Sequence, residues 1–295
     1  MAKLGRFKND KAREEYMRTY RELEKQWRIP SATLDVSTSY GTTRVRKAGA
    51  GEGVPIVLMH SLGGNSLSWD HVIEDFARDH LVYMPEMIGA PGLSVQTAPL
   101  DETGFGTWFG EVLDGLGVDQ VHLVGYSQGG WQALVIGTTQ QARLASLTVV
   151  EPTGTLTKIK WSLLWTMIRI GARPTDKNLR KMNARLNPGV TLTDAEYAGV
   201  KAALGYSPTI GYPKMFTDDR LATITTPTLA LLGSESLAIN PQLAEQRLRD
   251  NVPSCEVEIV PKAGHGIFHQ FPKLVTSRIL DFTRRYEPTD ARHGE

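Results

Sequence analysis

The residues best suited to chemistry surround a serine that stands between two glycines. Residues 125–129 read Gly-Tyr-Ser-Gln-Gly, a G-x-S-x-G motif that follows an apolar strand-like run and precedes a helix-like run, 131–141. A strand that turns directly into a helix leaves no room for flanking side chains, and glycines meet that condition. The residue at the apex is strained and pushed out at the end of the strand. Ser127 is therefore the candidate nucleophile, although a glycine-rich turn with an incidental serine would match the motif alone.

A serine hydroxyl needs a base that removes its proton, and a neutral imidazole suits that role near neutral pH. His265 stands in a Gly-His-Gly loop, residues 264–266, which follows the last strand-like run. We interpret His60 as a structural residue of another loop and His269 as a pocket or helix-start residue. His265 is therefore the expected base.

A second loop could stabilise negative charge. It reads His-Ser-Leu-Gly-Gly over residues 60–64 and follows the continuous apolar run 54–59. Backbone N–H groups exposed at the carboxyl end of a strand can hold a developing oxyanion. A glycine loop that merely turns the chain is the simpler alternative.

The elements that must position these residues alternate along the chain. Apolar strand-like runs over 54–59, 81–84, 121–126 and 145–150 are separated by helix-like runs, which predicts a parallel sheet with helices on both faces. Ligand sites in such sheets lie beyond the carboxyl ends of the strands. Four candidate polar side chains follow strands in this way: His60, Glu86, Ser127 and Glu151.

The alternation stops after residue 152. Residues 153–220 contain helix-like runs over 161–170, 177–186 and 194–204 and no convincing strand, so we expect an inserted helical cap. Tyr16, Tyr20, Leu23 and Trp27 have helical spacing and predict an amphipathic helix over 8–28, packed on the domain or on a partner subunit. A helix is also expected over 68–79 and a last helix over 267–286. The predicted organisation is an N-terminal helix (1–30), an α/β core (31–152 and 221–286), a helical cap (153–220) and a flexible tail (287–295).

Composition limits the partners. The 295 residues contain 33 Lys and Arg against 32 Asp and Glu, so the net charge is +1 and no long-range field favours nucleic acid or a membrane surface. The single cysteine, Cys255, excludes an internal disulfide and a thiolate metal cluster. We expect a cytoplasmic protein that needs no metal or organic cofactor. The apolar face of the N-terminal helix leaves a homodimer open.

The serine motif, the late Gly-His loop and the helical insertion together resemble the α/β-hydrolase fold superfamily over about residues 33–286. Among its members the chain is most similar to single-domain bacterial carboxylesterases with an extra N-terminal helix, a likeness also carried by residues 216–221 and 226–233. The resemblance implies an α/β-hydrolase fold with an inserted helical cap. It also implies an oxyanion hole formed by the backbone N–H groups of Leu62 and Gln128. Ser61 replaces the glycine that usually follows the loop histidine.

The acid that orients the histidine has two candidates. In most members of this fold it stands three residues after the glycine that ends strand seven, but here that position is Ser236. Glu235 is one residue early. A minority of members place the acid after strand six, about two dozen residues beyond the nucleophile, where this chain has Glu151. We favour Glu151 over Glu235, because a carboxylate that points elsewhere cannot orient the imidazole.

These residues predict a serine hydrolase that cleaves a small-molecule carboxylic ester or lactone through an acyl-enzyme. Ser127 would attack, His265 would move the proton and Glu151 would orient His265. Two alternatives remain, because the fold supports many activities. The same pocket could perform non-hydrolytic chemistry as a cofactor-free oxygenase or lyase, or the chain could be a catalytically inactive binding protein.

Overall fold

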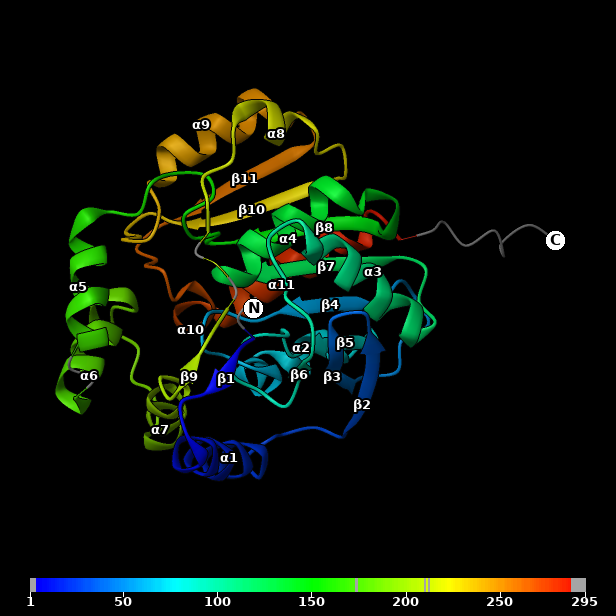
Figure 1. Ribbon diagram of the computed structural model, residues 1–295. Coiled ribbons are helices and arrows are strands. Elements are labelled where there is room, and N and C mark those ends of the chain that lie inside the picture. The colour runs from blue at the N-terminus through cyan, green and yellow to red at the C-terminus, as the bar shows by residue number, and fades with distance from the viewer. Residues whose placement is uncertain (1–3, 173–174, 210, 212, 288–295) are drawn as a thin grey trace.

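The computed structural model describes residues 4–172, 175–209, 211 and 213–287 and is built around a nine-stranded mixed sheet (Figure 1). Its strands follow the order β11-β10-β8-β7-β4-β5-β3-β2, with β6 paired to β3. Their bounds are β2 Ser31–Thr38, β3 Gly41–Ala48, β4 Ile56–Met59, β5 Val82–Pro85, β6 Val95–Gln96, β7 Val121–Tyr126, β8 Leu144–Val150, β10 Thr228–Gly233 and β11 Cys255–Val260. The predicted α/β-hydrolase fold is confirmed.

The centre of the sheet is parallel, and the edge formed by the first strands of the chain is antiparallel. Strands β5, β4, β7, β8, β10 and β11 pair in parallel, whereas β3 pairs antiparallel with β2, β5 and β6. All residues of β4 and β10 are buried, which explains their continuous apolar sequences. The parallel strands bring their carboxyl ends to one edge of the sheet.

Helices cover both faces of the sheet, and each layer has its own core. One core contains α3 Gly104–Leu116, α4 Gln128–Thr139, α8 Asp218–Ala222 and α9 Pro241–Asn251. The other contains α2 Ile73–Ala77, α10 Ile267–Gln270 and α11 Pro272–Arg284. In both layers large aliphatic and aromatic side chains on the helices pack against the buried strand residues, which keeps the central sheet in a fixed position.

Three helices project from the carboxyl edge of the sheet within the predicted cap region (Figure 1, left). They are α5 Trp161–Ala172, α6 Asp176–Leu186 and α7 Asp194–Ala203. Thr175 and Thr193 cap α6 and α7 by accepting hydrogen bonds from the third helical N–H group. These caps explain where α6 and α7 begin, because neither helix is strongly apolar.

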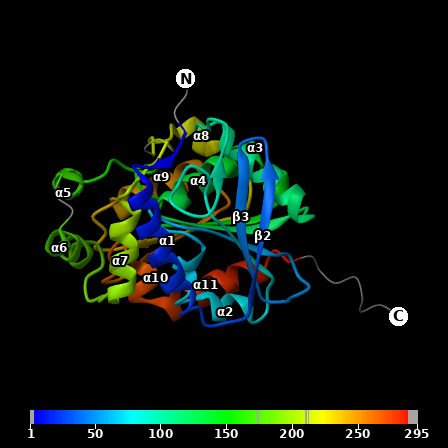
Figure 2. The ribbon, with the colours of Figure 1, turned by 60° about the horizontal axis from the view of Figure 1, so that its bottom comes forward.

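The N-terminal segment contacts the cap region through a pairing that the sequence pattern did not indicate. Strand β1, Arg6–Phe7, pairs antiparallel with β9, Tyr206–Ser207, so residues 153–220 are not purely helical. Helix α1, Asp10–Glu24, follows with Asn9 as its cap and ends four residues before the predicted boundary. Figures 1 and 2 show α1 beside α7, and the two helices are in contact.

Two further helices differ from the sequence expectation. The predicted helix over 267–286 is two helices, because Pro272 cannot donate a backbone hydrogen bond and begins a new helix after Phe271. The expected helix over 68–79 is a 3-10 turn, Ser66–Trp69, followed by the short α2, since Asn65 and Ser68 cap each other there. None of the helices within the described ranges is long and apolar enough to cross a membrane. Residues 288–295 of the predicted tail lie outside the described residues.

Candidate active site

Ser127 occupies the sharp turn between β7 and α4. Its backbone has a φ of 57° and a ψ of −114°, which is sparsely populated for residues other than glycine. The turn continues from a buried strand into a helix without an intervening loop. The serine side chain is therefore presented at the carboxyl edge of the sheet, and the residue retains 7% of its exposure.

The two glycines of the motif are required by close backbone contacts. A Cβ atom on Gly125 would lie 2.3 Å from the carbonyl oxygen of Gly129. A Cβ atom on Gly129 would lie 2.2 Å from the carbonyl oxygen of Met59. Both contacts are far inside van der Waals distance and involve backbone that cannot rotate away. The turn can therefore pack on β4 only with glycines at these positions.

Three side chains from three loops form one hydrogen-bonded series. The Nε2 atom of His265 lies 2.9 Å from Ser127 Oγ, and its Nδ1 atom lies 2.9 Å from Glu151 Oε2. Ser127 follows β7, Glu151 follows β8 and His265 follows β11. The parallel sheet thus brings together residues that are far apart in sequence.

Glu151 is completely buried and well supplied with donors. The Gly233 N–H group donates to its Oε1 atom at 2.7 Å, and the Ser236 hydroxyl donates to its Oε2 atom. Its backbone φ of 52° is again in the left-handed region. Two functional candidates, Ser127 and Glu151, therefore have strained backbones, as is common for residues that a site requires in one orientation.

The partners define how the histidine is protonated. An ionised Glu151 carboxylate can only accept, so His265 Nδ1 carries the proton in their hydrogen bond. The Nε2 atom is then free to accept the Ser127 hydroxyl proton. This is the tautomer that a general base for serine requires.

Glu235 is not part of this series. It is exposed on the turn after β10, and its backbone N–H group donates to the Ala263 carbonyl at 2.8 Å. Its carboxylate has no hydrogen-bond or ion-pair partner among the described residues. Ser236, the next residue, instead faces inward and contacts Glu151.

The two residues expected to supply oxyanion donors lie at the start of α4 and in the loop after β4. Gln128 is the first residue of α4, and the first N–H groups of a helix have no partner within it. Leu62 lies in a turn that is closed by a 3.0 Å hydrogen bond from Gly64 N–H to Ser61 O. The Leu62 side chain is on the surface, with 52% exposure.

His60 holds the start of this turn rather than contacting Ser127. Its Nε2 atom accepts from the Met87 N–H group at 3.1 Å, so its Nδ1 atom donates to the Ser61 carbonyl at 2.9 Å. Burial lowers the pKa of His60 to about 4, which keeps the ring neutral. This environment supports the structural interpretation of His60.

Sequence reasoning missed several neighbours of the series. Tyr126 donates to the His265 carbonyl at 3.0 Å, its ring stacks on the imidazole, and burial raises the pKa of its hydroxyl. Thr153 Oγ1 lies 3.3 Å from Ser127 Oγ. The contact of Ser236 with Glu151 could have been inferred, because Ser236 stands at the position where an acid was sought. Tyr126 is the variable residue of the serine motif, and no spacing rule identifies its contact.

Comparison with known proteins identifies relatives along most of the chain. Residues 56–278 match the alpha/beta hydrolase family. Two similar proteins of Bacillus subtilis (strain 168) are the carboxylesterase nap, 25% identical, and the carboxylesterase YbfK, 28% identical. Each alignment covers 90% of this chain, with 91% of the first relative and 93% of the second. The crystal structure of the naproxen esterase of Bacillus subtilis superposes with a TM-score of 0.85 at 23% identity, over 92% of this chain and 98% of that one.

Proposed function

The chain belongs to the alpha/beta hydrolase family, and we propose that it is a serine hydrolase that cleaves a carboxylic ester or lactone. The observation that carries the proposal is the series Ser127–His265–Glu151, in which both hydrogen bonds to the imidazole measure 2.9 Å. Its similarity to two carboxylesterases supports ester hydrolysis. The protein is an enzyme of the carboxylic ester hydrolase class.

The reaction begins with Ser127. Its Oγ atom attacks the carbonyl carbon of the substrate while its proton passes to His265 Nε2. The carbonyl oxygen becomes an oxyanion, which the N–H groups of Leu62 and Gln128 stabilise. When the carbon–oxygen bond to the alcohol breaks, the imidazolium gives its proton to the departing oxygen. A covalent acyl-enzyme on Ser127 remains.

Water then hydrolyses the acyl-enzyme by the same proton transfers in reverse order. His265 takes a proton from water, the resulting hydroxide equivalent attacks the acyl carbon, and the proton returns to Ser127 Oγ as the acid leaves. Glu151 stabilises the imidazolium in both halves of the reaction and keeps its own negative charge. With a lactone, the alcohol and acid of the product remain in one molecule.

Hydrolysis of a small panel tests this proposal. The panel contains p-nitrophenyl esters of increasing acyl length, several lactones and a naproxen ester, because a solved relative is named naproxen esterase. We expect turnover of at least one ester by the native enzyme and none by Ser127→Ala. Covalent labelling of Ser127 by a fluorophosphonate shows an activated serine independently of substrate choice. An unlabelled serine and an inactive panel would favour a binding protein.

Three sequence expectations belong to the same proposal. Residues 153–220 act as a lid over the carboxyl edge of the sheet, which is the side where α5, α6 and α7 project. The enzyme acts on small molecules in the cytoplasm and can form a homodimer. Fractionation of cells and light scattering of the purified protein test location and assembly separately.

A further inference from the structure

The loop that carries Leu62 is fixed at both of its ends by hydrogen bonds to other parts of the chain. His60 holds its start through the Met87 N–H group, as described above. Its other end is the pair Asn65 and Ser66, where the 3-10 turn begins. The position of the Leu62 N–H group therefore depends on what holds Asn65 and Ser66.

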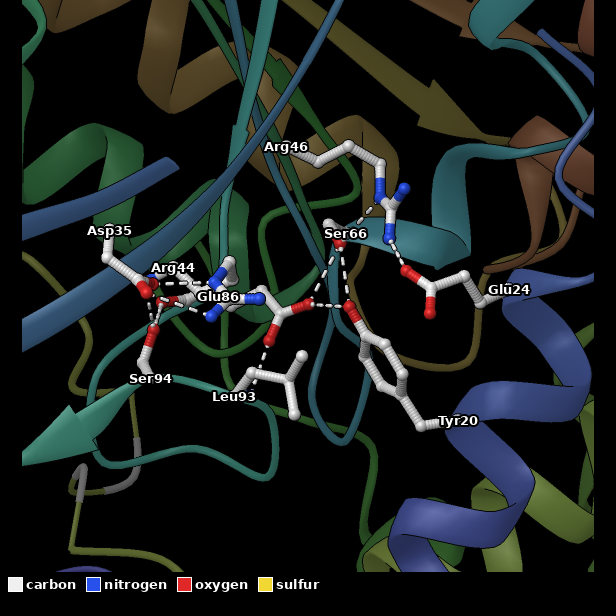
Figure 3. Close-up of polar contacts among 9 residues, drawn as sticks. All are labelled: Tyr20, Glu24, Asp35, Arg44, Arg46, Ser66, Glu86, Leu93 and Ser94. Carbon is white, nitrogen blue, oxygen red and sulfur yellow. Dashed lines mark hydrogen bonds and ion pairs between the residues drawn. The ribbon is translucent and has the colours of Figure 1, made fainter. Parts of the chain in front are cut away.

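Two tyrosines of α1 reach that second end. The Asn65 Nδ2 atom donates to the Tyr16 hydroxyl at 2.9 Å. The hydroxyls of Tyr20 and Ser66 both donate to Glu86 Oε1, at 2.7 Å and 2.8 Å. Figure 3 shows Tyr20, Ser66 and Glu86 converging in front of the sheet. Both tyrosine side chains are buried, with 2% exposure each.

Glu86 is the fixed point of this group. It is completely buried, and its Oε2 atom accepts from the Leu93 N–H group at 2.6 Å. The Ser94 hydroxyl donates to its backbone carbonyl at 2.6 Å, so the loop after β5 folds around the residue. Removing one hydrogen-bond donor from a buried carboxylate destabilises the folded protein, because the desolvated charge is no longer fully compensated.

The protonation states suit these contacts. Burial and the neighbouring Glu86 charge raise the pKa of both Tyr16 and Tyr20. Tyr20 therefore keeps its proton near neutral pH and donates it to Glu86. Arg46, also buried, pairs with Glu24 near the end of α1 (Figure 3). Its guanidinium also lies over the Trp27 ring. The end of α1 is thus also attached to β3 through Glu24, and the Arg46 Nε atom donates to Ser66 Oγ at 3.4 Å.

We infer that Tyr16 and Tyr20 are positioning residues for the oxyanion loop, residues 60–64. They act through Asn65, Ser66 and Glu86 to set the place of the Leu62 N–H group. Electrostatic stabilisation of an oxyanion requires a donor within about 2.7–3.1 Å of the developing charge, so a small displacement reduces it. The inference rests on the proposed function, because it assigns α1 a part in the same hydrolysis.

The test compares Tyr20→Phe and Tyr16→Phe with a matched control in the same helix. Thr19→Val removes a buried hydroxyl that, among the described residues, bonds only to Tyr16 O and Glu15 O within α1. We expect each tyrosine variant to lower kcat for a p-nitrophenyl ester about tenfold, less than the loss of a whole oxyanion donor, with KM within about twofold. The control should keep both constants.

A second measurement separates positioning from ordinary destabilisation. A phenyl-substituted trifluoromethyl ketone adds to the serine and forms an oxyanion, so its inhibition constant reports the oxyanion donors. That constant should rise in both tyrosine variants in proportion to the fall in kcat/KM. Melting temperatures measured beside the control identify any general loss of stability.

Three outcomes would overturn the inference: unchanged kcat in both tyrosine variants, a fall in kcat with an unchanged inhibition constant, or an equal fall in Thr19→Val. If Tyr20→Phe does not fold, the result for Tyr16→Phe decides whether the inference holds, since among the described residues the Tyr16 hydroxyl bonds only to Asn65. Fluorophosphonate labelling of Ser127 is recorded for every protein. A native enzyme that is not labelled refutes the proposed function itself, whereas a labelled enzyme with unaffected tyrosine variants refutes only the role of α1.

Discussion

The hydroxyl of Ser236 donates a hydrogen bond to Oε2 of Glu151, the same oxygen that lies 2.9 Å from His265 Nδ1. The loops after β8 and β10 therefore meet at a single carboxylate. A residue after β10 supplies a donor, and a residue after β8 supplies the charge. In the proposed mechanism this relationship lets Glu151 act as the acid, although Ser236 occupies the position at which most members of the fold carry it.

Glu151→Gln should reduce turnover roughly 10⁴-fold, because an amide cannot stabilise the imidazolium and favours the wrong histidine tautomer. Glu235→Gln should leave turnover nearly unchanged, since Glu235 is exposed and does not contact His265. The two variants are compared by kcat on the best ester and by melting temperature. An inactive Glu235→Gln enzyme together with an active Glu151→Gln enzyme would show that Glu235 is the acid that orients His265.

Ser127→Ala should fold like the native protein and lose ester turnover by roughly 10⁴-fold or more, because the substitution removes the nucleophile but little packing. Steady-state rates and intact-protein mass after fluorophosphonate treatment check this result. Near-native hydrolysis by this variant would exclude an acyl-enzyme on Ser127.

Gly129→Ala should destabilise the protein by about 2 kcal/mol or more, because overpacking a rigid site commonly has that effect. The added Cβ would lie 2.2 Å from Met59 O and 2.7 Å from His60 O, so the oxyanion loop must shift as well. Gly211→Ala is the control, since no atom of the described residues, its chain neighbours aside, lies within 4 Å of its added Cβ. Equal melting temperatures for the two variants would contradict this reading of the turn.

Acidification should weaken the fold through buried neutral histidines. Burial lowers the pKa of His60 to about 4, and burial, His269 and Arg28 lower that of His71 to about 3, from the ordinary value of 6.5. Between those values and about 6.5 the unfolded chain binds more protons than the folded chain, so the free energy of unfolding falls as pH falls. Melting temperatures measured from neutral pH to about 5 should decline less steeply in His71→Gln. An identical slope of melting temperature against pH in the two proteins would show that His71 does not contribute to the loss of stability in acid.

The proposed lid should be the first part of the chain that a protease cuts. Limited proteolysis followed by mass spectrometry should give early cuts within 153–220, and labelling of Ser127 should slow them if the lid closes over the acyl group. Initial cleavage within 121–150 would argue against this arrangement.

Local patterns in the sequence were sufficient for the fold and for the candidates of the site. The G-x-S-x-G motif and the Gly-His-Gly loop are each defined by the strand and helix beside them, and the alternation of apolar runs predicted the parallel sheet. The choice between Glu151 and Glu235 was harder, because spacing along the chain does not say which side chain points inward. The structure brings Glu151 to His265, and its role as the acid stays a prediction until the variants are compared.

Long-range contacts were the part that the sequence could not predict. A two-residue strand such as β1 has no periodicity, so its pairing with β9 has no local signal. The spacing of Tyr16 and Tyr20 indicated only an apolar helix face, since a tyrosine contributes the same ring to the pattern whether or not its hydroxyl has a partner. Pro272 did carry a signal, because a proline within a helical pattern usually begins a new helix.

The pairing of the N-terminal segment with the cap region also constrains how the chain assembles during synthesis. Lys8 contacts the Leu204 carbonyl across 196 residues, whereas Tyr20 and Glu86 are separated by only 66. At about 5–20 residues per second a ribosome needs roughly 6–24 s to add the residues from Glu86 to Leu204 (204 − 86 = 118). Helix α1 can therefore pack on the oxyanion loop early. Its face toward α7 stays uncovered until the rest of the polypeptide is synthesised. Docking of the cap region onto α1 is then a late step of assembly.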